Sequence, residues 1–359
     1  MVKAFETLRW AGATDGVLEL LDQRKLPGRM EYLACRTPEQ LFEAIVTLAV
    51  RGAPAIGVAA AYGICLACRQ IPDTTPTTET LKTILKTADY LAQSRPTAVN
   101  LFWALNRMKR TAQQLLAANP TCSTGQPKEA LLAEAKTIET EDRRMCDAIG
   151  LYGQQLIPDN ATILTHCNAG ALATAGIGTA LAPIYTAHAQ GKKICVYMDE
   201  TRPLLQGARL TAWELAQSGI DAVLQCDNMA ASLMKSRKIN AILVGADRIA
   251  ANGDTANKIG TLALSILARH FGVPFYVAAP SSTFDLSIPD GTCIPIEHRR
   301  DDEVTYVAGS RVAPEQISVY NPAFDVTDHA DITAIITEQG VIERPDTDTI
   351  RQCFRQDNP

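Results

Sequence analysis

The chain has 359 residues and a formal net charge of -5 at pH 7; 47% of its residues are hydrophobic and 20% are charged. This balance is ordinary for a globular protein and excludes disordered and fibrous classes. The acidic charge argues against nucleic acid as a partner, because a surface that binds a phosphate backbone needs a basic stripe. Since a single core rarely grows beyond about 250 to 300 residues, the length predicts two domains.

The N-terminal part is predicted to be mainly helical after a few short strands. Gly and Pro turns separate strand-like segments at residues 4–10, 17–21 and 30–33. Thr37, Pro38 and Gln40 match the N-cap, first-turn proline and capping-box glutamine of a helix start. Apolar residues at helical spacing predict helices at about residues 38–49, from Pro54 onward, and at 81–91, 99–116 and 128–156.

From residue 158 onward, short apolar runs alternate with amphipathic stretches of helix length. The predicted strands are residues 161–165, 194–198, 222–224, 241–244 and 275–278, and the predicted helices are residues 172–189, 208–218, 229–236 and 258–271. This alternation is typical of a parallel sheet covered by helices. We therefore predict an α/β protein with a Rossmann-like, doubly wound C-terminal domain at 158–359 and a smaller, mainly helical N-terminal domain at 1–157.

Polar residues follow each of the five predicted strands. In a doubly wound sheet the ligand lies outside the carboxyl ends of the strands, so these residues are the candidates for chemistry. They are His166-Cys167-Asn168, Asp199-Glu200-Thr201-Arg202, Cys226-Asp227-Asn228, Asp247-Arg248 and Ser281-Ser282. Asp and Asn at such places often cap the following helix, and we interpret Asp227 and Asn228 in that way.

Asp247 and Cys167 have settings that favour chemistry. A polar loop at residues 248–254 is expected to delay the next helix until about Asn257, so Asp247 comes too early to cap that helix. At the mouth of an apolar sheet, desolvation would raise its pKa and let it hold a proton near neutral pH. Cys167 precedes a turn that opens a helix, where free amides favour a thiolate. The alternative for Cys167 is a buried, unreactive thiol.

Basic residues stand at three predicted helix starts. Arg51 precedes Gly52 and Ala53 at the helix that begins near Pro54, Arg95 precedes the helix at residue 99, and Lys258 follows Asn257 at a third start. Amides at helix N-termini bind anions, so this pattern predicts a small phosphorylated ligand. The sequence has no GxxxxGK[ST] motif, and residues 176–178 (GIG) lack the third glycine of a dinucleotide fingerprint, which argues against kinases and dehydrogenases.

The ten cysteines lie in apolar segments without a secretory leader before them, which predicts a cytoplasmic location. Cys65 and Cys68 form a CxxC pair, but no second pair or His pair stands at ligand spacing, so we predict a buried helix face and no metal. The longest uncharged run, residues 168–191, is rich in Gly, Ala and Thr and contains Pro183. It is predicted to be packed interior, so no membrane partner is expected.

Seven segments carry a resemblance to a known family. They are residues 50–57 (VRGAPAIG), 94–101 (SRPTAVNL), 167–170 (CNAG), 200–211 (ETRPLLQGARLT), 245–250 (GADRIA), 252–261 (NGDTANKIGT) and 321–325 (NPAFD). In this order and spacing the chain resembles the methylthioribose-1-phosphate isomerase family over essentially its whole length. That family shares its fold with the alpha, beta and delta regulatory subunits of the eukaryotic translation initiation factor that exchanges guanine nucleotide, which lack the isomerase activity.

The resemblance implies a homodimeric isomerase that uses neither a cofactor nor a metal and acts on a small phosphorylated sugar in methionine salvage. Cys167 and Asp247 would be the catalytic pair, and the substrate contacts would be Arg51, Gly52, Ala53, Arg95, Gln206, Asn257 and Lys258. Alternatives that stay open are an isomerase for 5-deoxyribose 1-phosphate or ribose 1,5-bisphosphate, and a regulatory subunit without enzymatic activity. The sequence also leaves open whether a proton or a hydride moves between C2 and C1.

Overall fold

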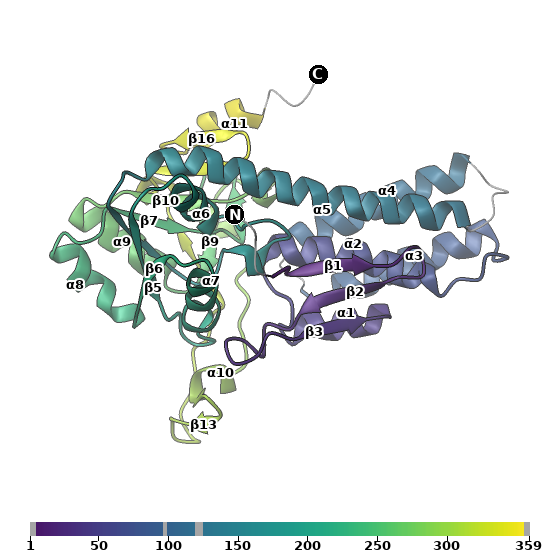
Figure 1. Ribbon diagram of the computed structural model, residues 1–359, viewed down its shortest axis with the longest axis horizontal. Coiled ribbons are helices and arrows are strands. Elements are labelled where there is room, and N and C mark those ends of the chain that lie inside the picture. The colour runs from purple at the N-terminus through teal and green to yellow at the C-terminus, as the bar shows by residue number, and fades with distance from the viewer. Residues whose placement is uncertain (1–4, 96–98, 119–124, 355–359) are drawn as a thin grey trace. The chain divides into compact units, whose positions relative to one another are not determined.

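The computed structural model describes residues 5–95, 99–118 and 125–354 (Figure 1). It contains two compact units. Of the described residues, the helical unit comprises those up to Cys146 together with Ala171–Gly178, and the sheet unit comprises Asp147–Gly170 and those from Thr179 onward. The predicted division into domains 1–157 and 158–359 stays a prediction. The compact units change over at Cys146–Asp147 and again on either side of Ala171–Gly178.

The helical unit begins with a three-stranded antiparallel sheet in the order β1-β2-β3, drawn in purple in Figure 1. Its elements are β1 (Leu8–Ala11), β2 (Val17–Leu21), β3 (Tyr32–Cys35), α1 (Pro38–Val46), α2 (Ala53–Arg69), α3 (Thr77–Ala92), α4 (Val99–Ala118) and α5 (Gly125–Gly153), which contains the changeover between units. The predicted start of α1 is confirmed, because Thr37 Oγ1 accepts a hydrogen bond from the Gln40 backbone at 3.3 Å. The Gln40 side chain accepts from the Arg36 backbone at 2.7 Å, which completes a capping arrangement.

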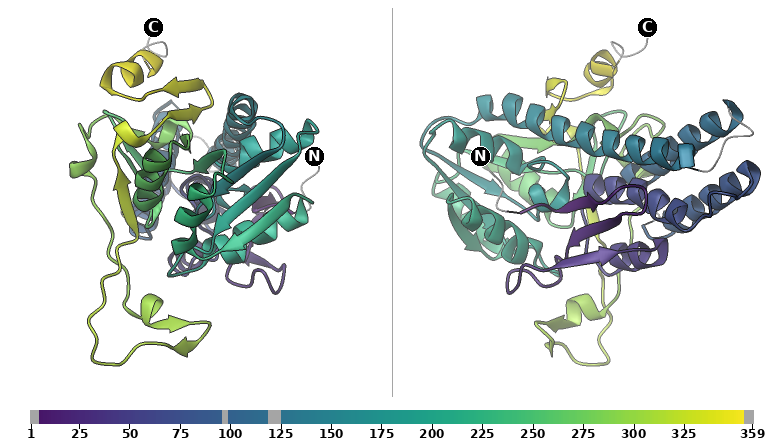
Figure 2. Two further views of the ribbon diagram at one scale, coloured as in Figure 1. Left: turned by 90° about the vertical axis from the view of Figure 1, so that its left-hand side faces the viewer. Right: turned by 45° about the vertical axis from the view of Figure 1, so that its right-hand side comes forward.

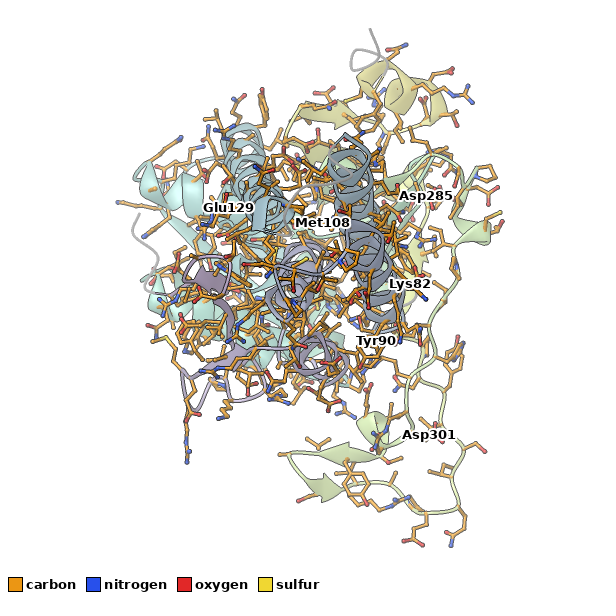
Figure 3. All side chains as sticks on the ribbon, turned by 90° about the vertical axis from the view of Figure 1, so that its right-hand side faces the viewer. Lys82, Tyr90, Met108, Glu129, Asp285 and Asp301 are labelled. Carbon is orange, nitrogen blue, oxygen red and sulfur yellow. The ribbon has the colours of Figure 1, made fainter. Side chains whose placement is uncertain are left out.

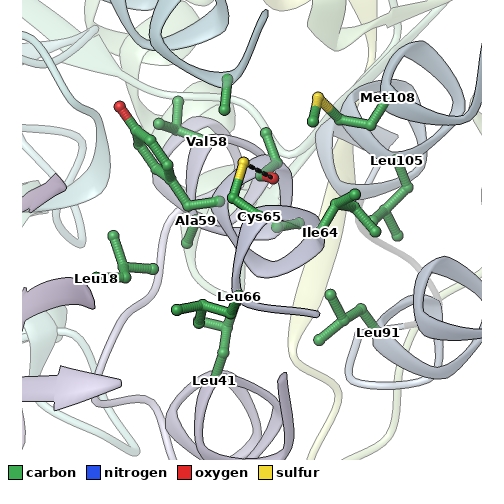
Figure 4. Close-up of a cluster of buried hydrophobic side chains, with 14 of the residues drawn as sticks. Leu18, Leu41, Val58, Ala59, Ile64, Cys65, Leu66, Leu91, Leu105 and Met108 are labelled. Atoms are coloured by element: carbon green, nitrogen blue, oxygen red, sulfur yellow. Dashed lines mark hydrogen bonds between the residues drawn. The ribbon is translucent and has the colours of Figure 1, made fainter. Parts of the chain in front are cut away.

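Helix α2 is the centre of the core of this unit (Figure 4). Every residue from Ala55 to Cys68 is buried, which explains why its sequence is apolar on all faces. Cys65 donates to the Ala61 carbonyl over 3.7 Å, and burial raises its pKa well above the ordinary value for a thiol. Burial also raises the pKa of Cys68 to about 12. The interpretation of the CxxC pair as part of a buried helix face is therefore confirmed.

The sheet unit is built on a seven-stranded sheet in the order β16-β15-β10-β7-β4-β5-β6 (Figure 2). Six strands are parallel, and β16 pairs antiparallel with β15 at one edge. The strands are β4 (Ala161–Thr165), β5 (Ile194–Asp199), β6 (Asp221–Gln225), β7 (Ala241–Val244), β10 (Phe275–Ala278), β15 (Ala334–Thr337) and β16 (Gly340–Glu343). The first five were predicted from the sequence to within one residue at each end.

The strand order reverses between β4 and β7. From β4 the chain adds β5 and β6 on one side, and it then adds β7, β10 and β15 on the other. This is the order of a doubly wound sheet, so the predicted fold class is confirmed. Such a sheet binds its ligand at the reversal, outside the carboxyl ends of the strands. Cys167 and Asp247 follow the two strands that flank this point.

Helical segments lie before, between and after the strands of the main sheet. They are η1 (Gln154–Leu156), α6 (Leu181–Ala189), the π-helix η3 (Gly207–Thr211), α7 (Ala212–Gln217), η4 (Asp227–Met229), α8 (Ala230–Lys235), α9 (Thr261–Phe271), η5 (Ser281–Thr283), η7 (His329–Asp331) and α11 (Thr347–Phe354). Side chains of α8, α9 and α11 share one buried cluster with β7, β10 and β15.

Two predictions of secondary structure were wrong. The helix expected at 172–189 is α-helical only from Leu181, and Ala171–Ala173 form a short 3-10 turn (η2). Gly178, at φ 101°, interrupts the pattern between them. The polar loop expected after Asp247 contains strands β8 (Arg248–Ala250) and β9 (Thr255–Lys258). Lys258 therefore lies in a strand, and α9 begins only after Gly260.

Strands β8 and β9 join β11 (Phe284–Asp285) and β14 (Phe324–Thr327) in a second sheet in the order β11-β8-β9-β14. Between η6 (Gly291–Cys293) and β14 the chain forms an arm with α10 (Asp302–Thr305) and the hairpin of β12 (Tyr306–Val307) and β13 (Ser310–Arg311). Figure 2 (left) shows this arm extending from the rest of the sheet unit, and Figure 3 places Asp301 on it, far from Asp285. Among the described residues, none of the helices combines the length and apolar character needed to cross a bilayer.

Candidate active site

Cys167 has a strained backbone at the end of β4. Its φ is 62°, in the left-handed region that residues other than glycine rarely adopt. Two threonines hold it there: the Cys167 N–H donates to Thr201 Oγ1 at 2.8 Å, and Thr211 Oγ1 donates to the Cys167 carbonyl at 2.5 Å. Strain of this kind costs roughly 1–3 kcal/mol and persists where the surroundings enforce it, often at active sites.

The segment after β5 supplies both threonines: Thr201 lies in the turn, and Thr211 is the last residue of the π-helix η3. Both oxygens of the Asp227 carboxylate accept from this turn, one from the Thr201 N–H and one from the Arg202 N–H, each at 2.7 Å. The interpretation of Asp227 as a cap of its own helix was therefore wrong, because its carboxylate fixes a neighbouring turn. Gly207 packs so closely that a Cβ there would lie 1.7 Å from the Asp199 carbonyl oxygen. The turn continues into the π-helix η3, a form that is frequent at functional sites.

Gln206 lies at the start of this π-helix with only 7% of its surface exposed. Within the described residues, its buried side-chain oxygen has no hydrogen-bond partner. An unpaired buried acceptor costs about 1–3 kcal/mol, so native proteins rarely retain one without a purpose. A ligand hydroxyl would satisfy this oxygen, which suits the predicted substrate contact.

Asp247 is half-buried after β7, and its N–H donates to the Ala256 carbonyl of β9 at 2.9 Å. This bond places Asp247 beside the strand that carries Asn257 and Lys258. Asn257 donates to Thr261 Oγ1 at 3.0 Å. Lys258 Nζ donates to the Ala323 carbonyl at 3.0 Å, and it lies 4.7 Å from the centre of the Phe324 ring. A backbone carbonyl and an aromatic face both favour the charged ammonium.

Asp325 anchors the segment that follows Lys258. Its carboxylate accepts from the N–H groups of Gly260 at 2.8 Å and Leu262 at 3.1 Å, at the first turn of α9. Burial raises the pKa of Asp325, although these two hydrogen bonds oppose the shift. The sequence analysis included this residue only as part of the 321–325 motif. In the structure its carboxylate binds the backbone at the start of α9.

His166 and Asp199 form a buried pair next to Cys167, with 1% of each side chain exposed. Nδ1 of His166 lies 2.9 Å from Asp199 Oδ2, and Nε2 lies 2.8 Å from the Ile259 carbonyl oxygen. Burial alone would lower the pKa of His166, but the hydrogen bond and charge of Asp199 raise it overall. Burial raises the pKa of Asp199 as well, against the effect of His166. The two side chains thus lie within hydrogen-bond distance, and each affects the pKa of the other.

Two groups of side chains in the described part of the chain are close enough to hold a metal ion: His166, Asp199 and Asp227, and Asp254, Asp328 and His329. Hydrogen bonds already engage every member. In the second group, Asp254 accepts from the Gly291 and His329 N–H groups, Asp328 accepts from Ala330, and His329 Nδ1 lies 2.9 Å from the Pro345 carbonyl. These bonds account for the positions of all six side chains without an ion.

In the helical unit, Arg51 is buried and its Nε donates to Gln23 Oε1 at 3.0 Å. Gln23 in turn donates to the Leu172 carbonyl at 2.7 Å, so Gln23 links the Arg51 guanidinium to the backbone of Leu172. Gly52, at φ 91°, begins α2 without a side-chain cap, and a Cβ there would lie 2.6 Å from Ala173. The amides from Ala53 onward are therefore uncapped by a side chain, as an anion site requires.

Arg95 is half-buried and follows α3, next to the buried Ser94. Pro96 and Thr97, which complete the predicted phosphate motif, lie outside the described residues.

The predicted site residues thus fall into two sets. The sheet unit holds Cys167, Gln206, Asp247, Asn257 and Lys258 on the segments that follow β4, β5 and β7. The helical unit holds Arg51, Gly52, Ala53 and Arg95. Sequence reasoning placed His166, Asp199 and Thr201 at the strand ends but gave no contacts for them or for Thr211, because their partners are 33 to 93 residues away in the chain.

The doubly wound sheet makes this an α/β protein, and Cys167 and Asp247 lie at the reversal of its strand order, where sheets of this kind bind their ligands. The chain belongs to the initiation factor 2 subunit family, whose model matches residues 49–344.

Relatives in this family carry enzyme names. A methylthioribose-1-phosphate isomerase of Syntrophotalea carbinolica is 56% identical over 91% of this chain and 94% of its own length. A 5-deoxyribose 1-phosphate isomerase of Moorella thermoacetica is 55% identical over 92% of this chain and 93% of its own.

Solved structures agree on the fold. The 5-methylthioribose 1-phosphate isomerase of Pyrococcus horikoshii OT3 has a TM-score of 0.90 at 41% identity, covering 99% of this chain and 97% of that one. A structure named as the delta subunit of translation initiation factor eIF-2B from A. fulgidus has a TM-score of 0.86 at 41% identity, covering 98% of this chain and 100% of that one.

Proposed function

We propose that this chain is an aldose–ketose isomerase that converts 5-methylthioribose 1-phosphate into 5-methylthioribulose 1-phosphate in methionine salvage. The observation that carries the proposal is the strained Cys167 at the reversal of the sheet, with Asp247 following the adjacent strand. A protein that only bound a partner would gain nothing from a cysteine forced into the left-handed region by two buried threonines. The names of the relatives point to the same reaction.

The chemical problem is that the anomeric oxygen of this sugar carries the phosphate, so the ring does not open in the ordinary way. Asp247, as a neutral acid, donates a proton to the ring oxygen while the bond from that oxygen to C1 breaks. Cys167, as thiolate, removes the proton from C2, and the C–H electrons form a double bond between C1 and C2. Cys167 then returns a proton to C1, and the C2 hydroxyl gives its proton to Asp247 as the ketone forms. Both groups are regenerated, so no cofactor is needed.

A hydride route uses the same two residues. After Asp247 opens the ring, the hydrogen at C2 moves to C1 with its electron pair, and Cys167 accepts the proton of the C2 hydroxyl. That proton then passes from Cys167 to Asp247, which restores both groups. In deuterated water the enol route places solvent deuterium at C1 of the product whenever the thiol exchanges its proton before returning it, whereas the hydride route always retains the original hydrogen.

Phosphate recognition is assigned to cations and amides. Arg51, Arg95 and Lys258 are the proposed cations, and the backbone amides at Gly52 and Ala53 are the proposed neutral donors. Gln206, with its unpaired oxygen, is assigned to a sugar hydroxyl, and Asn257 to a second polar group of the sugar. Orientation by these groups contributes to the rate because it fixes C1 and C2 relative to the acid and the base.

Two other functions have a specific observation behind them. The Moorella thermoacetica relative is named for 5-deoxyribose 1-phosphate, which differs from the proposed substrate only at C5. The A. fulgidus structure carries the name of a translation factor subunit, which would make the chain a binding protein. An activity assay separates these from the proposed function.

The test is a coupled assay on 5-methylthioribose 1-phosphate, 5-deoxyribose 1-phosphate and ribose 1,5-bisphosphate, without added metal or nicotinamide. Asp247→Asn and Cys167→Ser are each expected to lower kcat by at least about 10²-fold, the range for loss of a general acid or base. Asp221→Asn and Cys195→Ser, in strands of the same sheet, are the matched controls and should retain activity. Turnover of none of the three sugars would contradict the proposal and favour the binding protein.

The proposed enzyme is a cytoplasmic homodimer. The surface of the sheet unit supports dimerisation, because the edge strand β6 exposes Val223 and Leu224, and the arm exposes Val312, Ile317 and Tyr320. Light scattering on the purified protein should give twice the mass of 38.8 kDa. A monomeric mass at micromolar concentration would contradict this part of the proposal.

A further inference from the structure

A continuous line of hydrogen bonds crosses the carboxyl edge of the main sheet. Gln225, the last residue of β6, donates to Asp199 Oδ1 at 2.8 Å, and Asp199 ends β5. Its other oxygen faces His166, the first residue after β4, and the far side of the His166 ring meets the Ile259 carbonyl. Three neighbouring strands are thereby connected to the segment between β9 and α9.

The partners of His166 determine where its protons are. The Ile259 carbonyl can only accept, so Nε2 must carry a hydrogen. Nδ1 faces the Asp199 carboxylate, with which it shares the remaining proton. Neither ring nitrogen is left for Cys167 or for a ligand. The pair differs in this respect from a cysteine–histidine dyad, in which the histidine must take the proton of the thiol.

The segment that His166 reaches is the one that carries Asn257 and Lys258. Ile259 follows them directly, and Gly260 lies against the ring, where a Cβ would come within 2.8 Å of it. The Asp325 carboxylate accepts a hydrogen bond from the N–H of Gly260 at 2.8 Å. The His166 side chain therefore lies between two segments. One is the turn of Cys167, its neighbour in the chain, and the other is the segment that follows Lys258.

We propose that His166 and Asp199 are positioning residues, which hold the Cys167 turn in place against the segment of Asn257 and Lys258 and take no part in proton transfer to the substrate. The inference rests on the roles proposed above for Cys167 and Lys258. It assigns a function to the most deeply buried pair of titratable side chains at the strand ends, which the mechanism itself does not use.

The first experiment measures directly which ring nitrogens of His166 are protonated. The chain has five histidines, so the protein labelled with ¹⁵N-histidine gives five pairs of imidazole nitrogen signals, and the pair lost in His166→Gln belongs to His166. Nε2 of His166 is expected to be protonated throughout the pH range in which the enzyme is active. An unprotonated Nε2 would remove the bond to Ile259 and overturn the proposal, and this measurement does not depend on any substrate.

The second experiment uses kinetics. His166→Gln should lower kcat and raise KM together, with a combined loss in kcat/KM of about 10- to 100-fold, as displacement of reacting groups by an ångström produces. Asp199→Asn preserves the bond from Gln225 and donates to Nδ1, so its loss should be smaller and its pH profile should match that of the wild type. His270→Gln, on the exposed side of α9, is the control.

The third experiment follows the Cys167 thiol. Its alkylation rate, measured by mass spectrometry with the exposed Cys226 as an internal reference, should rise several-fold in His166→Gln because the turn is released. If the wild type turned over none of the sugars, a raised alkylation rate would still support the positioning role while the proposed function failed. A His166→Gln variant with wild-type kcat, KM and alkylation rate would overturn the inference. Loss of kcat alone with a shifted pH profile would instead make His166 a proton-transfer group.

Discussion

The Cys167 backbone N–H donates to the Thr201 hydroxyl oxygen over 2.8 Å, and this bond helps to hold Cys167 at φ 62°. Thr201 is itself in the left-handed region, at φ 65°, and its hydroxyl donates to the Asp199 carbonyl at 3.1 Å. The Cys167 turn is therefore held by the turn that contains Thr201. The Asp227 carboxylate holds that second turn, because it accepts a hydrogen bond from the Thr201 N–H. The backbone geometry of Cys167 therefore depends on residues outside the predicted site.

We predict that Thr201→Val lowers kcat by about tenfold or more. Valine has the shape of threonine but no acceptor, so the buried Cys167 N–H loses its partner, which costs about 1–3 kcal/mol; 1.4 kcal/mol corresponds to a factor of ten in rate. Thr201→Ser keeps the hydroxyl and should stay close to the wild type. Steady-state kinetics of both variants test this, and equal rates for Val and Ser would refute it.

Replacing Cys167 should reverse the usual stability order of alanine and glycine. Alanine is normally the more stable of the two, but in the left-handed region a Cβ costs about 1–2 kcal/mol. Cys167→Gly is therefore expected to be more stable than Cys167→Ala by about 1 kcal/mol, although both variants are inactive. Urea unfolding measures the difference, and a Cys167→Ala protein at least as stable as Cys167→Gly would show that this position is not strained.

Gly207→Ala is expected to abolish activity and to destabilise the protein. The added Cβ would lie 1.7 Å from the Asp199 carbonyl oxygen, a backbone atom that moves only if β5 moves. Overpacking of this kind costs typically about 1–3 kcal/mol. Gly28→Ala is the control, because its nearest neighbour would be at an ordinary 3.5 Å. Thermal unfolding of the two variants gives the comparison, and equal melting temperatures would argue against the close contact.

The pair of His166 and Asp199 predicts that the free energy of unfolding changes with pH in opposite directions in the wild type and in Asp199→Asn. Asp199 raises the pKa of His166 above the ordinary value of 6.5, and Asp227 and Asp325 also face the ring. A folded-state pKa above the unfolded one gives stability that is complete below pH 6.5 and is lost as pH rises toward the folded value. Above 6.5 the free energy of unfolding of the wild type should therefore decrease, by at most about 1.4 kcal/mol per pH unit.

Asp199→Asn should show the reverse. Without the carboxylate, burial lowers the pKa of His166 below 6.5, so the unfolded chain binds the extra proton and the variant loses stability as pH falls. Unfolding in urea between about pH 5.5 and 8.5 measures both curves. Parallel curves for the two proteins would mean that His166 and Asp199 do not share a proton.

The amino-acid sequence by itself determined the strands of the main sheet and the residues at their ends. A buried parallel strand is a short apolar run, and the polar residue after it is readable from the sequence because both signals are local. For this reason Cys167 and Asp247 could be predicted as neighbours of a ligand site. The start of α1 at Thr37 was predictable for the same reason, since a capping box spans only a few residues.

Only the tertiary structure decided what these residues contact. Residues 248–258 have too few apolar side chains to predict a strand. They become β8 and β9 because they pair with each other, and because β9 also pairs with β14 and β8 with β11. Asp227 looked like a helix cap, yet its carboxylate binds a turn 26 residues earlier. His166 meets Asp199 and Ile259, which lie 33 and 93 residues away. Such pairings depend on the strand order of the sheet, which brings distant segments together and which no local pattern in the chain records.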